Sequence, residues 1–318
     1  MHTFDFITYN RPMQRKLIDY LIISLKGIAM GAADAVPGVS GGTIALISGI
    51  YEELISSISN INLSLFKTLF SKGFKTFWSQ LNGNFLLALL SGIILSFVSF
   101  MRLAKYLIEN EPILIWSFFF GLIIASIYFV GKQITKWGFL VIIGLIVGTI
   151  VAFYISTLPS MANNENSYFL FFAGALAICA MILPGISGSF ILVILGAYKT
   201  LSDALHDFDL KKIVIFAVGT VIGLLSFSHL LKWLFKHFHN LTLAILTGFI
   251  FGSLNKVWPW KVTVTSYINS KGIELPLVEQ SVLPASYEGD NQLFFAILLM
   301  IAGFLTIFIL EKVGSKNN

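Results

Sequence analysis

The sequence predicts an all-α polytopic membrane protein arranged as an inverted-topology repeat, with one re-entrant helical hairpin and three transmembrane helices in each half. Three observations support this prediction. The 318 residues are 56% hydrophobic and only 12% charged, with a mean hydropathy of +0.84, whereas a soluble domain carries roughly 25% charged residues. Apolar runs long enough to cross a bilayer recur along the chain. A Pro-Gly motif also occurs twice.

The composition restricts the possible partners and cofactors. The formal net charge is +5, and in a membrane protein such an excess usually belongs to cytoplasmic loops, so we expect no nucleic-acid partner. The single cysteine, Cys179, excludes an intrachain disulfide and argues against a cysteine-based metal site. No Asp, Glu and His cluster has metal-ligand spacing. We therefore expect no metal and no cofactor.

The motif that occurs twice defines the two halves. Residues 37–54 read PGVSGGTIALISGIYEEL and residues 184–201 read PGISGSFILVILGAYKTL, so eight of eighteen positions are identical. A second pair follows in the same order, because residues 91–107 align with residues 218–234. Chance rarely gives two such matches in order. We assign the first repeat to residues 1–158 and the second to residues 168–312.

The lengths of the apolar segments separate spans from hairpins. Six segments are long enough to span the membrane: about 85–107, 113–131, 137–158, 213–235, 241–258 and 293–310. The arms around the second motif, 168–183 and 190–201, would be roughly 24 and 18 Å long as helices, too short to cross a core of about 30 Å twice. We therefore predict a re-entrant hairpin over 168–201 and a matching one over 20–55, with arms 20–35 and 43–55.

The predicted crossings set the topology. Three spans per half make the second half begin on the opposite side of the membrane, as in the inverted repeats of secondary transporters. Thirteen Lys and Arg then lie inside and eight outside, so we expect both termini to be cytoplasmic. Residues 61–82 carry aromatic residues and lysines at helical spacing, which favours an interfacial helix over a solvated loop. The polar residues 259–291 should form an outer loop.

Glycine and serine gather at the two predicted hairpin tips, where the backbone turns inside the membrane. Amide groups without helical partners at such breaks favour anions, and phosphate above all. The alternative is a tight turn whose amides are satisfied by Ser40, Ser187 and neighbouring carbonyl groups. The candidate phosphate-binding residues at the tips are Gly38, Ser40, Gly41, Gly42, Thr43, Gly185, Ser187, Gly188 and Ser189.

Basic residues occupy matching places in both halves. Arg102 lies near the outer end of one predicted span, and His229 lies near the inner end of its repeat partner, so inversion would put one at each face. Either could receive an anionic head group, although snorkelling to lipid head groups is the simpler alternative. Lys26, on the arm before the first tip, could neutralise a phosphate or Asp34.

Three acidic residues are candidates for coupling transport to protons. Asp34 lies inside an apolar hairpin, where desolvation favours the protonated form and where acids usually have a function. A helix-capping carboxylate or a pair with Lys26 is the equal alternative. Glu52 and Glu53 follow at the cytoplasmic end of the hairpin, where a solvated helix end is the simpler interpretation.

These motifs carry a family resemblance. Residues 26–53, KGIAMGAADAVPGVSGGTIALISGIYEE, together with PGISGS at 184–189, resemble the signature of the bacterial polyprenyl-phosphate translocase family. The resemblance implies flipping of undecaprenyl phosphate from the outer to the cytoplasmic leaflet, which recycles this carrier lipid for cell-envelope synthesis. It also implies a bacterial inner membrane. From the residues themselves we expect membrane lipids as further partners, and protons as partners through the three acidic residues.

Two other functions stay open. The first is a membrane phosphatase acting on polyprenyl pyrophosphate, with Ser40 or Ser187 as the nucleophile, but no acid or histidine is placed to activate both. The second is a small-anion transporter, which would need a continuous aqueous path. The sequence holds no zinc-protease motif, phosphate-binding loop or serine-hydrolase elbow. We therefore expect a transporter and no enzyme.

Overall fold

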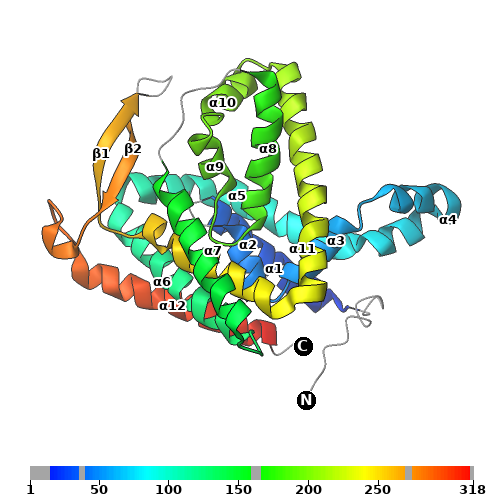
Figure 1. Ribbon diagram of the computed structural model, residues 1–318, viewed down its shortest axis with the longest axis horizontal. Coiled ribbons are helices and arrows are strands. Elements are labelled where there is room, and N and C mark those ends of the chain that lie inside the picture. The colour runs from blue at the N-terminus through cyan, green and yellow to red at the C-terminus, as the bar shows by residue number, and fades with distance from the viewer. Residues whose placement is uncertain (1–14, 36–39, 159–165, 269–273, 316–318) are drawn as a thin grey trace.

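The computed structural model describes residues 15–35, 40–158, 166–268 and 274–315, and these are mostly helical (Figure 1). Within these ranges some side chains lie outside the description, Arg102 among them. Gly38 lies outside the described residues altogether. By length and composition, three described helices can cross a membrane, or up to five if each of two bent pairs is one span. The prediction of a helical, polytopic membrane protein is confirmed at this level.

The first predicted hairpin contains three helices and not two. These are α1 (Leu17–Asp34), α2 (Gly41–Ile47) and α3 (Tyr51–Ser59). The second hairpin repeats the pattern with α8 (Ser167–Ile182), α9 (Gly188–Ile194) and α10 (Tyr198–His206). The prediction of continuous arms over 43–55 and 190–201 was therefore wrong.

Matched glycines end the short helices inside these arms. Gly49 has φ +73° and Gly196 has φ +66°, a left-handed conformation that glycine adopts without steric cost. After each glycine, the next amide bonds five residues back, from Ile50 to Ala45 and from Ala197 to Leu192. This is the helix ending that glycine favours, and it explains why this glycine recurs in both motifs.

The remaining long helices follow the predicted spans. They are α5 (Gly83–Asn110), α6 (Pro112–Lys132), α7 (Phe139–Thr157), α11 (Leu210–Gly252) and α12 (Leu293–Ser315). The predicted segments 213–235 and 241–258 correspond to the two parts of α11, which meet at a kink at Phe238 (φ −135°, ψ 45°). A short 3₁₀ turn, η2 (Ser253–Val257), follows α11 and takes up the end of the second segment. The kink lies where polar residues interrupt the apolar pattern.

The helix predicted over 61–82 is bent in the middle. α4 (Leu63–Leu81) has a non-helical Gly73 with φ +77°, and α4 projects from the body of the molecule (Figure 1). The bend brings the rings of Phe66 and Phe77 to 6.2 Å between centroids. Phe70 remains 89% exposed. The apolar side of α4 is therefore unpartnered within the described chain.

The predicted outer loop 259–291 contains regular structure. Strands β1 (Lys261–Ile268) and β2 (Glu274–Ser281) pair antiparallel and lie at the left of Figure 1. A short 3₁₀ turn, η3 (Pro284–Ser286), follows them. The all-α prediction therefore missed one hairpin of strands. The alternation of Val and Thr in KVTVT is the β-type signal that pointed to it.

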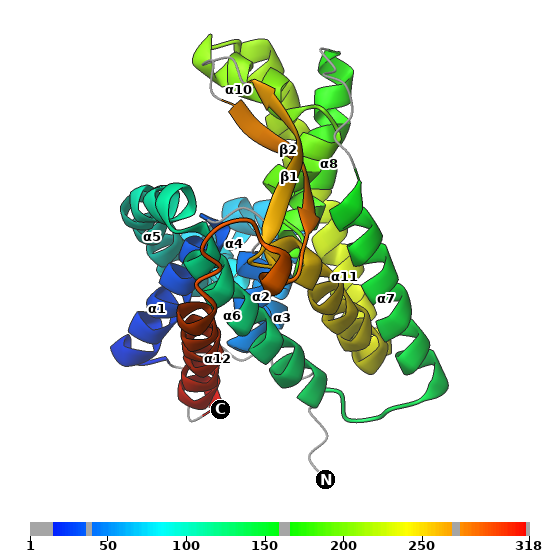
Figure 2. The same ribbon diagram turned by 90° about the vertical axis from the view of Figure 1, so that its left-hand side faces the viewer.

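Glycines let the main helix pairs approach closely. Figure 2 shows α7 beside the second part of α11. A Cβ on Gly31 would lie 2.6 Å from the carbonyl oxygen of Ile93 in α5, and a Cβ on Gly223 would lie 2.6 Å from that of Ala175 in α8. The glycine pairs at 27/31, 144/148, 219/223 and 248/252 all have this packing role, because each glycine meets a neighbouring helix.

This packing predicts that a Gly→Ala substitution destabilises the protein at Gly31 but not at Gly131. Gly31→Ala is expected to lower the free energy of unfolding, because overpacking costs about 1–3 kcal/mol and the gain in helix propensity offsets only about 1 kcal/mol. Gly131→Ala is the matched control, since its Cβ would meet only a methyl group of Thr247 at 3.8 Å. Thermal unfolding in detergent measures both. Equal melting temperatures for the two variants would contradict the close approach of α1 and α5.

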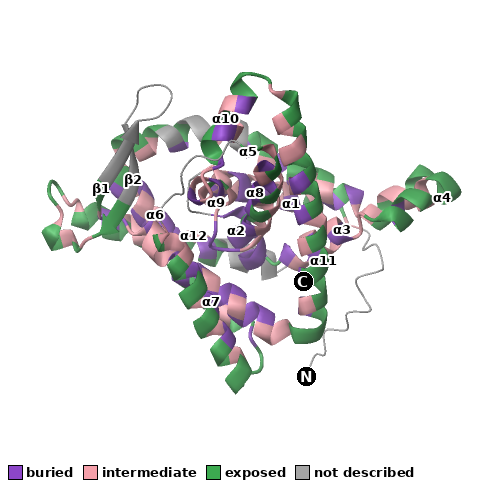
Figure 3. Ribbon diagram, turned by 45° about the horizontal axis from the view of Figure 1, so that its top comes forward, coloured by how far each residue is buried: buried purple, intermediate pink, exposed green. Residues whose placement is uncertain are grey.

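The centre of the fold is α2, in which every residue from Gly41 to Ile47 is buried (Figure 3). Exposed residues are frequent on α4 and α7 in the same view. Since α2 begins at the first Gly-rich tip, the part of the motif from Ser40 to Ile47 lies inside the protein.

Candidate functional site

The two hairpin tips contact each other. The Ser40 hydroxyl lies 3.2 Å from the carbonyl oxygens of both Met181 and Leu183 at the end of α8. In the opposite direction, the amide of Gly185 donates to Oγ1 of Thr43 at 3.0 Å. Ser40 and Thr43 are both buried. Residues about 142 positions apart therefore build one polar contact at the centre of the protein.

The described amides of the first tip have partners within the protein. Gly41 donates to the Asp34 carboxylate at 2.7 Å, Gly42 donates to the Ser40 hydroxyl at 3.1 Å, and Thr43 donates to the Ser40 carbonyl at 3.0 Å. This is the geometry of the tight-turn alternative. In this conformation the first tip is closed, and its amides would reach a phosphate only after these bonds exchange.

The second tip is more open. The hydroxyls of Ser187 and Ser189 lie 2.9 Å apart and are exposed, and the Ser187 side chain makes no capping bond to α9. One of these hydroxyls donates to the other, so the second has a hydrogen left for a ligand. A small pocket adjoins this tip and includes Gly185, Ser187 and Lys256 in its lining.

Two lysines beside the second tip were not identified from the sequence. Lys256 Nζ lies 4.4 Å from the ring centroid of Phe190, and Lys261 Nζ lies 5.0 Å from that of Trp116. Both ammonium groups face Oε2 of Glu279, at 3.9 and 3.7 Å. The signal was the run KVWPWK at 256–261, because tryptophans beside lysines mark the level of lipid head groups.

Burial changes the ionisation of the second lysine. The Lys261 side chain is only 10% exposed, and desolvation lowers its pKa to about 8 against the smaller opposing effect of Glu279. The nearby Lys256 lowers this pKa further. Lys261 therefore loses its charge just above neutral pH.

Asp34 and Lys26 lie on the same helix but make different contacts. Asp34 accepts from the Gly41 amide and so caps α2, which agrees with the capping alternative. Lys26 Nζ donates to the carbonyl oxygen of Ser48 at 2.7 Å, at the break between α2 and α3. No described contact joins Lys26 to Asp34.

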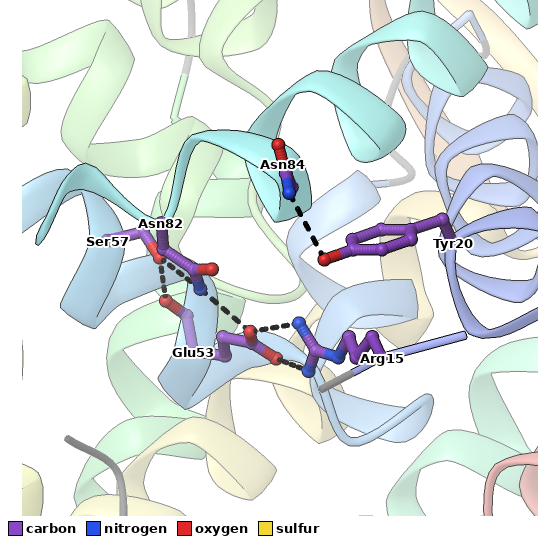
Figure 4. Close-up of polar contacts among 6 residues, drawn as sticks. All are labelled: Arg15, Tyr20, Glu53, Ser57, Asn82 and Asn84. Atoms are coloured by element: carbon purple, nitrogen blue, oxygen red, sulfur yellow. Dashed lines mark hydrogen bonds and ion pairs between the residues drawn. The ribbon is translucent and has the colours of Figure 1, made fainter. Parts of the chain in front are cut away.

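Glu53 is buried and ion-paired, so its interpretation as a solvated helix end was wrong. Its two carboxylate oxygens accept from Arg15 at 2.7 and 2.8 Å, and Asn82 also donates to it at 2.8 Å (Figure 4). Only 6% of Glu53 is exposed. The cluster joins the beginning of α1 to α3 and to the α4–α5 junction. Composition gave no sign of it, because Arg15 lies 38 residues away.

Glu52, one residue earlier, points to a different helix. Its Oε1 lies 3.0 Å from Nε2 of His239, beside the distortion in α11. Both side chains are partly exposed, at 38% and 40%. Glu52 therefore meets water as predicted, while it also links α3 to α11.

The basic residues predicted at the two faces are not brought to the tips by any described contact. The Arg102 side chain lies outside the described part. His229 is exposed on α11, with Nδ1 2.6 Å from the carbonyl oxygen of Leu225 in the same helix. Lys232 donates to Asn60 at 3.1 Å. Among the described residues, no group of three His, Cys, Asp or Glu could hold a metal ion.

Comparison with known proteins places the chain in a family. Residues 30–275 match the family model described as VCA0040-like, undecaprenyl phosphate translocase-like. A polyprenyl-phosphate transporter of Vibrio cholerae is 44% identical over 308 residues, covering 96% of this chain and 100% of the relative. A polyprenyl-phosphate transporter of Staphylococcus aureus is 34% identical over 255 residues, covering 74% and 85%. No solved structure matches. The chain belongs to the undecaprenyl phosphate translocase-like family.

Proposed function

We propose that this protein moves a polyprenyl phosphate, and specifically undecaprenyl phosphate, from the outer to the cytoplasmic leaflet of a bacterial inner membrane. The observation that carries the proposal is the direct contact between two hairpin tips that are broken in the same way. Broken helices that meet between two repeats form the substrate sites of many secondary transporters. Relatives in Vibrio cholerae and Staphylococcus aureus are named polyprenyl-phosphate transporters.

The matched elements support an inverted-topology repeat. The short helices have equal lengths in the two halves, since α2 and α9 have seven residues and α3 and α10 have nine. Close glycine packing also joins α1 to α5 and α8 to α11. With the repeats inverted, both termini are cytoplasmic and the strand hairpin is outside. α4 then lies along the cytoplasmic leaflet, where its exposed phenylalanines enter the lipid and Lys67, Lys72 and Lys75 face anionic head groups.

The tips lower the cost of moving the phosphate. A charge at the bilayer centre is costly, and hydroxyl and amide donors at the tips replace part of its water. The prenyl chain stays in the lipid. In this conformation the first tip is closed by Asp34, Ser40 and Thr43, so the phosphate is received first at Gly185, Ser187, Gly188 and Ser189. Transfer to Gly38, Gly41 and Gly42 follows, with Arg102, His229 and Lys26 supplying positive charge.

Protonation couples this movement to the proton gradient. Protonation of Asp34 weakens the bond from Gly41 and frees the first tip, while Glu52 and Glu53 respond at the cytoplasmic end of the hairpin. The test is uptake into sealed vesicles with and without an imposed pH gradient. Equal rates under both conditions would remove the coupling step and leave a passive flippase.

Sealed proteoliposomes that carry undecaprenyl phosphate test the transport itself. The purified protein is expected to reduce the fraction of lipid phosphate accessible to a membrane-impermeant reagent, and Arg102→Ala is expected to slow the change by roughly tenfold, the cost of about 1.4 kcal/mol of lost charge pairing. Lys136→Ala, at an exposed turn, is the matched control. Release of inorganic phosphate from vesicles that carry undecaprenyl pyrophosphate would instead support the phosphatase, and unchanged accessibility of undecaprenyl phosphate would favour a small-anion transporter.

A further inference from the structure

Lys256 and Lys261 lie beside the second tip but outside its Pro-Gly motif. Both are unusual because their ammonium groups are partly buried against aromatic rings. Lys256 lies against Phe190, and Lys261 lies against Trp116. The side chains are 28% and 10% exposed, so neither ammonium group is fully hydrated. A partly desolvated cation binds a phosphate more strongly than an exposed one, because the dielectric around it is lower.

The charges around the pair do not balance. Glu279 is the carboxylate that faces both ammonium groups, at 3.9 and 3.7 Å. The distances are long for charge-assisted hydrogen bonds, which are about 2.7–2.9 Å. Lys261 donates its close hydrogen bond to the carbonyl oxygen of Lys256 instead. Among the side chains that the structure describes, one positive charge is therefore left over, and neither lysine is bound tightly to the carboxylate.

The half-buried Trp258 next to the pair indicates a lipid ligand. Its indole N–H donates to the carbonyl oxygen of Val282, and a tryptophan with an apolar ring and a bonded N–H is typical of the membrane–water interface. Trp260 is buried, and its N–H donates to the carbonyl oxygen of Asn291, so it holds this segment in the core. The pocket beside Lys256 also includes Ser187, whose hydroxyl pair with Ser189 has a hydrogen to donate. Positive charge and hydroxyl donors thus meet beside Trp258.

We propose that Lys256 and Lys261, with Ser187 of the second tip, form the outer receiving site for the phosphate monoester head group of a prenyl lipid, from which the phosphate passes to the first tip. This inference rests on the proposed function and adds residues to it. The head group carries about −1.5 to −2 charges near neutral pH, so it neutralises the positive charge that Glu279 leaves. The prenyl chain extends into the lipid.

Binding of farnesyl phosphate to the purified full-length protein, with farnesol and inorganic phosphate as comparison ligands, tests the site. The double variant Lys256→Gln, Lys261→Gln is expected to bind farnesyl phosphate at least tenfold more weakly, while farnesol binding stays the same. Lys211→Gln, at an exposed position at the beginning of α11, is the control and should bind as the wild type does. Equal farnesyl phosphate affinity in the double variant and the wild type would overturn the proposal. A wild-type protein that binds inorganic phosphate but does not bind farnesyl phosphate would also overturn it.

The pH dependence of the affinity for farnesyl phosphate distinguishes a lysine that contacts the phosphate from a lysine that only stabilises the fold. Between pH 7 and 9 the phosphate stays doubly charged, since its second pKa is about 6, while Lys261 loses its proton around its pKa of about 8. Affinity should therefore fall as the pH rises. In Lys261→Arg the guanidinium stays charged, so the fall should become smaller. An equal fall in both proteins would contradict contact between Lys261 and the phosphate, even if the double glutamine variant fails to fold.

Different results would contradict the receiving site and the proposed transport function. If the wild type binds farnesyl phosphate and moves undecaprenyl phosphate but the lysine variants match it in both assays, only the receiving site is wrong. If the wild type moves no lipid in proteoliposomes, the proposed function is wrong as well.

Discussion

Replacing Glu53 with alanine is expected to lower the free energy of unfolding by about 3 kcal/mol or more, the usual cost of breaking a buried ion pair from one side. The Glu53 side chain is 8% exposed and that of Arg15 is 19% exposed, so water cannot replace the lost contact. The substitution leaves the Arg15 guanidinium without its bidentate partner and removes the closer of the two acceptors of Asn82, whose other acceptor is the Ser57 hydroxyl. Thermal unfolding in detergent, followed by circular dichroism, measures the loss.

An exposed pair on the same protein is the control. Lys199 and Asp203 lie one helical turn apart in α10, with side chains 57% and 40% exposed, so Asp203→Ala should change the free energy of unfolding by no more than about 0.5 kcal/mol. A second test combines Arg15→Met with Glu53→Leu. This double variant should recover much of the stability, because it removes both charges together. Losses of equal size at Glu53 and Asp203 would contradict a buried pair.

The sequence predicted the positions of helices better than their internal breaks. The spans at 113–131 and 137–158 correspond to α6 and α7 within a few residues, because continuous apolar runs have one stable form in lipid. The helix break at Gly49 was not predicted, because an argument from segment length treats each hairpin arm as one continuous helix. The repeated glycine was visible in both motifs, and it recurs because each copy ends a helix in the left-handed conformation.

The candidate site was predicted only in part, because the sequence shows local patterns and not contacts between distant segments. Local pattern identified the tips, since Gly and Ser gather where backbone groups need partners. It could not show that the Ser40 hydroxyl bonds to carbonyl groups about 140 residues away, or that Arg15 reaches Glu53. It also passed over Lys256 and Lys261, because their environment comes from Phe190, Trp116 and Glu279 on three other elements. Contacts between distant segments depend on packing that a single sequence does not display.

Gly42→Ala should reduce transport strongly with little change in secondary structure. A Cβ at this position would press against the carbonyl oxygen of Ile182 at the second tip, and that neighbour is backbone and cannot rotate away. Overpacking of about 1–3 kcal/mol at the contact between the tips corresponds to roughly a 5- to 150-fold change in the population of the state that needs this contact. The rate of loss of accessible undecaprenyl phosphate in proteoliposomes measures the effect.

A Gly→Ala substitution away from the tips shows whether the loss of transport comes from the contact between the tips or from replacing any glycine. Gly138 precedes α7, and a Cβ there would meet nothing within 4 Å, so Gly138→Ala should transport at the wild-type rate. If Gly42→Ala keeps the wild-type rate while remaining folded, the tips need not touch during transport, and the phosphate path must lie elsewhere. If it loses transport and Ser40→Ala, which removes the hydroxyl bonds to Met181 and Leu183, loses transport too, then close approach and polar contact are both required. The meeting of the two tips is then a step of the transport cycle and not only a packing feature of the resting fold.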